Sequence, residues 1–180
     1  MRSAQNLIKM SLRNVEIKAK VHDLDDIVNR AKSLNPIKSE IIQQHDTFYN
    51  VSHGRLKLRQ FKDSTGELIY YDRPDSEGPK ISNYRKSAIT KESLNDLPHV
   101  LEEALGVKQV VKKVRQLFVV GQTRIHIDNV EALGNFMELE VCLEDNQSLE
   151  EGKQIADDLM AKLNVKKEDL LSGAYADMLK

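Results

Sequence analysis

Residues 124–141 alternate between ionisable and apolar side chains in two consecutive runs, which a short loop around Gly134 separates. The ionisable positions of these two runs are Arg124, His126, Asp128, Glu138 and Glu140. Because successive side chains of a β-strand point to opposite faces, this period of two predicts a hairpin with all of these charges on one face. The fold of the chain depends on which face of this hairpin is turned inward.

The same alternation recurs along the chain and predicts about eight strands. The expected strands cover residues 14–21, 39–50, 55–61, 67–73, 80–90, 107–120 and the two runs within 124–141. Turns rich in glycine, serine and aspartate join many of the neighbouring strands, so the sheet should be largely antiparallel. With helices added, the predicted class is α+β, built around a large sheet or barrel.

Apolar residues at helical spacing predict helices over residues 24–34, 94–105 and 148–163, and a final short helix over 167–179. Asp23 is a suitable N-cap for the first helix, and Gly106 a suitable end for the second. Pro98 lies inside the second pattern, which predicts a break or a helix in two parts.

Composition narrows the class of protein. A chain of 180 residues fits one domain, expected over residues 14–180, after a flexible segment 1–13 for which a short presequence is the other interpretation. The 27 basic and 28 acidic residues do not indicate a general surface for polyanions. The single cysteine, Cys142, fits a cytoplasmic protein, and no apolar run is long enough to cross a membrane.

Two arrangements of the charged faces remain open from spacing alone. In the first, apolar residues form the core and the charges face water. In the second, the sheet closes into a wide barrel that carries the charges inside, and amphipathic helices cover its apolar outer face. Carboxylates at these positions suit Mg²⁺ or Mn²⁺, and the lysines and arginines suit phosphate.

An ordered set of short motifs resembles the CYTH domain family, one of the triphosphate tunnel metalloenzymes, and most of all its class IV adenylate cyclase-like branch. The motifs lie at residues 15–20, 46–50, 54–59, 113–115, 127–130, 133–140 and 172–179. The resemblance implies a closed, mostly antiparallel eight-stranded β-barrel with amphipathic helices packed outside. Its tunnel would bind a small-molecule triphosphate together with Mg²⁺ or Mn²⁺.

The resemblance also implies roles for residues at matching positions. The implied metal ligands are Glu16, Glu138 and Glu140. The implied catalytic residues are Lys20, Arg59 and Asp128, and the implied substrate-binding residues are Lys18, Lys57, Arg73, Lys113, Arg115 and Arg124. His126 shares the charged face and is expected to be a hydrogen-bonded wall residue. His45 and Asp46 are expected at a tunnel mouth or in a structural role.

The chain departs from the family pattern in two places. Lys18 stands where the family has its second glutamate, and Asp72-Arg73-Pro74 replaces a Lys-Gly-Pro, with Arg73 as the expected substitute for the lysine. An ammonium close to a divalent cation is strongly repelled by it. We therefore expect that one metal position is lost or that Lys18 binds phosphate instead.

The function expected from these residues is metal-dependent hydrolysis of a triphosphate, either inorganic or organic such as thiamine triphosphate. The alternatives are a class IV-type adenylate cyclase that makes cyclic AMP from ATP, and a non-catalytic binder of triphosphate or polyphosphate. No specific nucleic acid and no membrane is expected as a partner, and the chain is expected to act as a monomer or homodimer.

Overall fold

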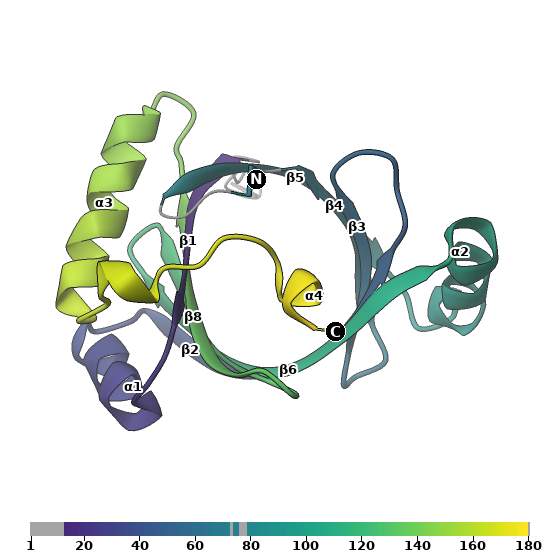
Figure 1. The fold of residues 1–180 in the computed structure, drawn as a ribbon, viewed down its shortest axis with the longest axis horizontal. Coiled ribbons are helices and arrows are strands. Elements are labelled where there is room, and N and C mark those ends of the chain that lie inside the picture. Colours follow the sequence, from purple (N-terminus) through teal and green to yellow (C-terminus); the bar gives the residue numbers. More distant parts are fainter. Residues whose placement is uncertain (1–12, 73, 76–78, 180) are drawn as a thin grey trace, which may run out of the picture.

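Eight antiparallel strands close into a barrel in the computed structural model, which describes residues 13–72, 74–75 and 79–179 (Figure 1). The order around the barrel is β1-β5-β4-β3-β2-β6-β7-β8, and β8 pairs back with β1. The strands are β1 Arg13–Lys20, β2 Lys38–Tyr49, β3 Arg55–Phe61, β4 Gly66–Asp72, β5 Lys80–Ile89, β6 Val107–Val120, β7 Thr123–Val130 and β8 Gly134–Cys142. The predicted barrel is confirmed.

The register around β8 brings the charges of three strands to the same levels of the barrel. Glu138 lies opposite His126 of β7 and opposite Lys18 of β1. Two residues further along β8, Glu140 lies opposite Arg124 of β7 and Glu16 of β1. Directly opposed residues in a sheet are close neighbours, so closure of the barrel assembles a cluster from both ends of the chain.

The apolar face of this part of the barrel is turned outward, and two helices cover it. Helix α1, Leu24–Ser33, and helix α3, Leu149–Lys162, lie beside β1 and β8 in Figure 1. The fully buried strand residues beneath them are Val15, Ile17, Ile125, Ile127, Met137 and Leu139. This placement settles the choice between the two arrangements, because the charged face is the inner one.

Local signals explain where these two helices begin. The Asp23 side chain accepts a hydrogen bond from the Asp26 N–H, and Ser148 and Glu151 form a capping box. In α3, Gly152 lets the helix approach the barrel closely, because an added Cβ would lie 2.5 Å from Leu143 Cδ2. Both helices agree with the sequence prediction to within a residue or two at their ends.

The second predicted helix is divided, as its proline indicated. A 3₁₀ turn, η1 Ser93–Asn95, precedes α2, Leu97–Leu105, and Pro98 lies in the first turn of α2. Proline is tolerated there because the first N–H groups of a helix have no partner within the helix.

The prediction of a single helix over residues 167–179 is wrong. The structure has a 3₁₀ turn, η2 Lys167–Asp169, and a short helix, α4 Tyr175–Met178, with non-helical chain between them. The Leu171 N–H donates to the Lys18 carbonyl, and Leu170 forms a β-bridge with Ala19. Gly173 has a positive φ of 73°, which ends any helical path at a residue without a Cβ.

This C-terminal segment, residues 170–179, closes one end of the barrel. Figure 1 shows it crossing the opening, with α4 at the opening. Tyr175 and Ala176 are buried there in an apolar cluster with Phe48, Val111, Val130 and Phe136. The interior is therefore blocked on this side by packed side chains.

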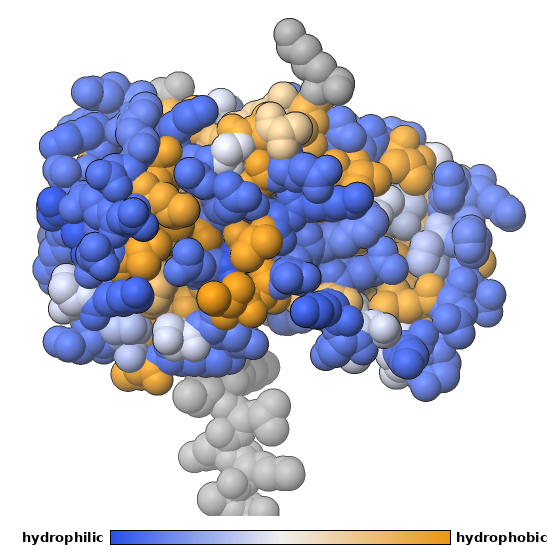
Figure 2. Space-filling view, turned by 90° about the horizontal axis from the view of Figure 1, so that it is seen from below, coloured by the Kyte–Doolittle hydropathy of each residue, from blue (hydrophilic) through white to orange (hydrophobic). Residues whose placement is uncertain are grey.

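The outer face has no single large apolar area in the view of Figure 2, where hydrophilic residues dominate and hydrophobic ones show between them. Ile41 of β2 and Val114 of β6 are 72% and 42% exposed. None of the helices in the described residues has the length and apolar character needed to cross a lipid bilayer. The expectation for residues 1–12 lies outside the described part of the chain.

Candidate functional site

The barrel encloses a cavity of about 270 Å³, lined by the charged faces of the strands. All eight strands contribute to its wall, and Ala174 and Tyr175 of the C-terminal segment contribute to the closed end. The predicted residues that line it are Glu16, Lys18, Lys57, Arg59, Lys113, Arg115, Arg124, Glu138 and Glu140. The strand periodicity of two thus directs most of the predicted site into one space.

Asp46 organises the cations on one side of the cavity. Its carboxylate accepts two hydrogen bonds from Arg59, both of 2.7 Å, and one of 2.9 Å from Lys57. Burial would raise the pKa of Asp46, but the charges of Arg59 and Lys57 outweigh it and hold that pKa well below its usual range. Asp46 is therefore an ionised group that fixes two cations on the cavity wall.

Arg115 joins two carboxylates on the other side. It donates to both oxygens of Asp128, at 2.7 and 2.6 Å, and to Glu138 at 2.7 Å. The Tyr175 hydroxyl also donates to Asp128, at 3.1 Å. Burial would raise the pKa of Asp128, but the charges of Arg115 and Lys113 outweigh burial and lower that pKa to about 2. Asp128 therefore positions a basic neighbour, Arg115.

Lys113 is the buried cation with the weakest pairing in this group. Its Nζ lies 3.6 Å from Asp128, and its side chain is 3% exposed. Burial, followed by the charge of Arg115, lowers the pKa of Lys113 to about 7. This lysine changes its charge near neutral pH, and an incoming anion would favour its protonated form.

His126, Glu138 and Glu140 form a group that could hold a metal ion. One ligand atom from each lies within 4.8 Å of the others. His126 is 4% exposed, and its Nδ1 is buried without a hydrogen-bond partner. Burial, followed by the charge of Arg115, lowers the pKa of His126, so the imidazole is neutral at neutral pH and keeps a lone pair.

The donor set of this group fits a divalent cation. Burial raises the pKa of Glu140, but His126 and Arg124 outweigh it and bring that pKa to about 2, and the pKa of Glu138 is also well below its usual range. Both carboxylates are therefore ionised. Carboxylate oxygens suit Mg²⁺ and Mn²⁺, and the added imidazole nitrogen favours Mn²⁺ of the two.

Two predicted residues lie apart from this cluster. Lys20 is exposed at the end of β1, with its Nζ 5.4 Å from the centre of the Phe136 ring, and does not line the cavity. Arg73 lies outside the described residues, so its role stays a prediction. Arg124 lines the cavity and pairs with Glu140 at 2.9 Å.

Three residues contribute more to the site than the sequence patterns indicated. Asp46 lies in the cavity wall between two cations, and was expected at a mouth or in a structural role. His126 belongs to the candidate metal group, and Tyr175 closes one end of the cavity. A signal for His126 was present in its parity with Arg124 and Asp128, but parity alone does not say which residue lies across the strand pair.

The model of the CYTH domain family matches residues 12–175 of this chain. The chain belongs to the CYTH domain family. The match includes every strand of the barrel and most of the C-terminal segment. A protein of Methanocaldococcus jannaschii with a provisional adenylate cyclase name is 26% identical over 176 residues, covering 91% of this chain and 97% of that one.

Solved structures share the fold. The PH1012 protein of Pyrococcus horikoshii has a TM-score of 0.77 at 22% identity, covering 93% of this chain and 99% of that chain. The Hippeastrum protein HpAC1 has a TM-score of 0.61 at 14% identity, covering 89% and 91%, and its structure is described as revealing a dominant triphosphatase activity. Proteins that share this fold or are similar to this chain thus include ones described by both activities.

Proposed function

We propose that this CYTH protein binds a triphosphate in its barrel cavity and hydrolyses it with the help of a divalent cation. The observation that carries the proposal is the arrangement of the cavity wall. A wall with Lys57, Arg59, Lys113 and Arg115 faces the same space as the His126, Glu138 and Glu140 group. Phosphoryl transfer requires mainly that the phosphate is positioned and its charge neutralised. The cations of this wall and a cation held by the metal group would do both.

The cations of the cavity would hold the phosphate oxygens. In the structure these cations pair with Asp46, Asp128 and Glu138, so they are already fixed in place before a ligand arrives. Arginine binds phosphate through two parallel hydrogen bonds, and lysine through a compact charge. Held in this way, the phosphate chain would lie along Arg59, Lys113 and Arg115.

His126, Glu138 and Glu140, with Glu16 beside them, would hold the divalent cation. When bound, such a cation neutralises phosphate charge and lowers the pKa of water. In hydrolysis the water oxygen bonds to the terminal phosphorus, the bond from that phosphorus to the bridging oxygen breaks, and a proton is released. Tripolyphosphate would yield pyrophosphate and phosphate.

The size of the cavity favours hydrolysis over cyclisation. Pockets that enclose a drug-sized ligand have volumes of roughly 300–1,000 Å³. At about 270 Å³, with one end closed by Tyr175, the charged cavity suits a triphosphate chain, and a nucleoside would have to lie beyond it, toward the hollow of about 570 Å³ that Gln44, Phe61 and Lys113 also line. Cyclisation needs the ribose 3′-hydroxyl at the phosphorus, and therefore needs the nucleoside to be held inside as well.

Adenylate cyclase is the second candidate, because the M. jannaschii relative carries that name. The two activities are separated by a substrate panel of tripolyphosphate, thiamine triphosphate and ATP, each with Mg²⁺ and with Mn²⁺. We expect phosphate release with at least one substrate. Formation of cyclic AMP and pyrophosphate from ATP would show cyclisation and overturn the proposed hydrolysis. Tight binding without any turnover would indicate a binding protein.

Neighbouring lysines of β6 provide a matched pair of variants for this panel. Lys113 is buried in the cavity wall, whereas Lys112 is exposed on the outer face of the same strand. We expect Lys113→Met to lower kcat/KM by at least about 100-fold, the size of effect seen when a group that stabilises the transition state is removed. Lys112→Met should retain the activity. Equal losses in both variants would contradict the proposed site.

A further inference from the structure

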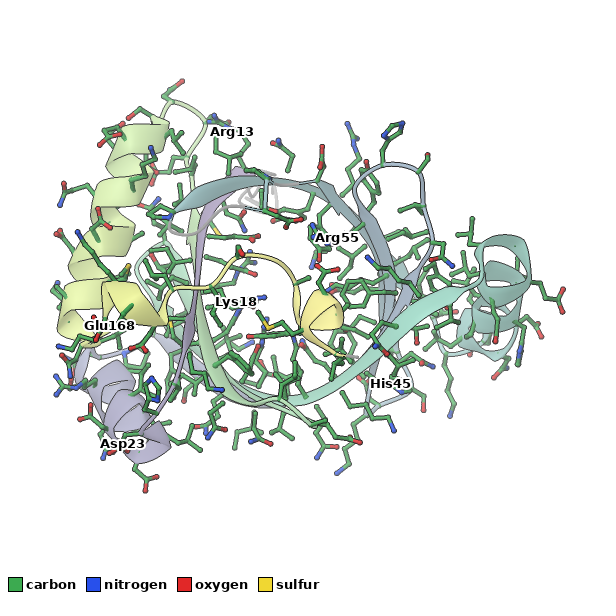
Figure 3. The ribbon with its side chains drawn as sticks, viewed as in Figure 1. Arg13, Lys18, Asp23, His45, Arg55 and Glu168 are labelled. Atoms are coloured by element: carbon green, nitrogen blue, oxygen red, sulfur yellow. The ribbon has the colours of Figure 1, made fainter. Side chains whose placement is uncertain are left out.

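Lys18 lies in a niche made of groups that stabilise a positive charge. Its Nζ is 3.1 Å from Glu138 Oε1 and donates to the Gly173 carbonyl at 3.2 Å. The centre of the Tyr175 ring lies 3.8 Å away, which adds a cation–π contact. The residue is 4% exposed, and Figure 3 shows Lys18 inside the barrel beside the C-terminal segment. The ammonium is thus enclosed in the manner of a bound cation.

The candidate metal group lies on the other side of the same carboxylate. Glu138 has Lys18 opposite it on β1 and His126 opposite it on β7. The His126 Nδ1 lies 3.9 Å from Glu138 and 3.8 Å from Glu140, too far for hydrogen bonds, and has no other partner. Arg115 also donates to Glu138 Oε2, at 2.7 Å, so the chain itself places two cations on this carboxylate, and a bound cation would lie on the His126 side.

A divalent cation on the Lys18 side would meet a strong repulsion. The ammonium already uses Glu138 Oε1 and the Gly173 carbonyl, which are the oxygen atoms that such an ion would need there. Repulsion between like charges a few ångströms apart is large where water is excluded. On the His126 side, the buried Nδ1 is unused, so that position still offers a ligand atom.

We propose that Lys18 acts as a permanent second cation of the site, so that the cavity takes a single divalent cation, held by His126, Glu138 and Glu140. The inference rests on the proposed function, because it assigns the cation content of the same site. Lys18 is a positioning residue in this arrangement. Its ammonium links the carboxylate of a metal ligand to the segment that closes the cavity.

The test is a titration with Mn²⁺ in which free Mn²⁺ is measured by electron paramagnetic resonance. We expect the wild type to bind one Mn²⁺, with or without tripolyphosphate, and Lys18→Glu to bind two. Lys18→Met removes the repulsion without adding a ligand, so it should bind one Mn²⁺ with an affinity at least about tenfold higher. Two ions in the wild type, or one in Lys18→Glu, would overturn the proposal.

Matched variants separate this effect from a general disturbance of the tunnel. Lys112→Met also removes a lysine of the barrel, but one exposed on its outer face, and it should leave both the number of Mn²⁺ ions and their affinity unchanged. His126→Ala should weaken Mn²⁺ binding by at least about tenfold. Each variant is checked for folding by thermal unfolding, and if Lys18→Glu does not fold, the affinity of Lys18→Met decides.

The two proposals fail in different ways. Two Mn²⁺ ions in a wild type that hydrolyses a triphosphate would overturn the role of Lys18 and leave the proposed function in place. One Mn²⁺ ion in a wild type that turns over none of the three substrates would overturn hydrolysis and retain the single-cation site.

Discussion

Arg115 donates hydrogen bonds to two carboxylates, those of Asp128 and Glu138. Its side chain is only 5% exposed, so these carboxylates take the place of water around its charge. Ion pairs buried to this extent add little net stability, because desolvation of the charges offsets their attraction. Losing one partner, however, leaves a buried charge unpaired at a cost of about 3–5 kcal/mol. The charged wall is therefore better explained by ligand binding than by folding.

We expect Lys113 to make the proposed triphosphate binding dependent on pH. Its pKa of about 7 means that the lysine is largely neutral above that pH in the free protein, and a bound anion raises this pKa. Binding above pH 7 therefore takes up a proton, and affinity falls by up to about tenfold per pH unit as the pH rises. Calorimetry at pH 8 in buffers of different ionisation enthalpy measures this uptake.

The control for this experiment is Lys113→Arg, which keeps a positive charge at every pH of interest. Tripolyphosphate also changes its own protonation, so the uptake assigned to Lys113 is the difference between the wild type and this variant. The same uptake in both proteins would show that Lys113 stays charged in the free cavity.

Strand parity was enough to predict which residues of each strand share a face, such as Lys18, Arg59 and Glu140, whereas the family resemblance implied that this face is the inner one. It was not enough to predict partners, because those depend on register and on barrel closure. His126 lies across from Glu138 only when β7 pairs with β8, and Lys18 meets Glu138 only when β1 does so from the other side. The two members of such a pair can lie far apart in the sequence, as Lys18 and Glu138 do.

Among the helices, α3 depends on a close approach at Gly152. A Cβ there would lie 2.5 Å from Leu143 Cδ2 and 2.8 Å from Val15 Cγ2, both buried. Gly152→Ala gains up to about 1 kcal/mol of helix propensity, but overpacking costs about 1–3 kcal/mol. We expect a net loss of about 1 kcal/mol in the free energy of unfolding, measured in urea by circular dichroism.

Gln154 offers a comparison on the exposed side of the same helix. Gln154→Ala should change the free energy of unfolding by no more than about 0.5 kcal/mol, as is usual for exposed positions. If Gly152→Ala is as stable as the wild type, α3 has room to move away from the barrel.

The C-terminal segment is the element that sequence reasoning described least well. Apolar residues at helical spacing were present, but they pack in two places, Leu170 on the core cluster outside the barrel and Tyr175 in the cluster at its closed end. Tyr175 packs on Phe136 at a ring distance of 5.1 Å, and Asp177 pairs with Arg55 and Lys108. These tertiary contacts hold a short turn of helix at the end of the barrel, and a local pattern does not contain them.

For the molecule as a whole, binding in an enclosed cavity should stabilise the fold. A ligand that binds only the folded state at 100 times its Kd adds about 2.7 kcal/mol. For a domain of this size, that corresponds to a rise in Tm of roughly 5–10 °C. We expect this rise with tripolyphosphate and Mn²⁺ together, followed by thermal unfolding.

The double variant Lys57→Met/Arg59→Met removes the cations that Asp46 holds. Its Tm should rise by less than about 2 °C under the same conditions, because it has lost two of the phosphate-binding groups. A rise as large as that of the wild type would mean that tripolyphosphate binds elsewhere on the molecule.

The closure of β1 on β8 also has a consequence for biosynthesis. Lys18 is translated before its partners Glu138, Gly173 and Tyr175, which follow more than a hundred residues later. During translation the charged face of β1 therefore lacks these partners until they too have left the ribosome. A nascent chain stalled before Tyr175 should lack the closed cavity, even though most of its strands have already emerged.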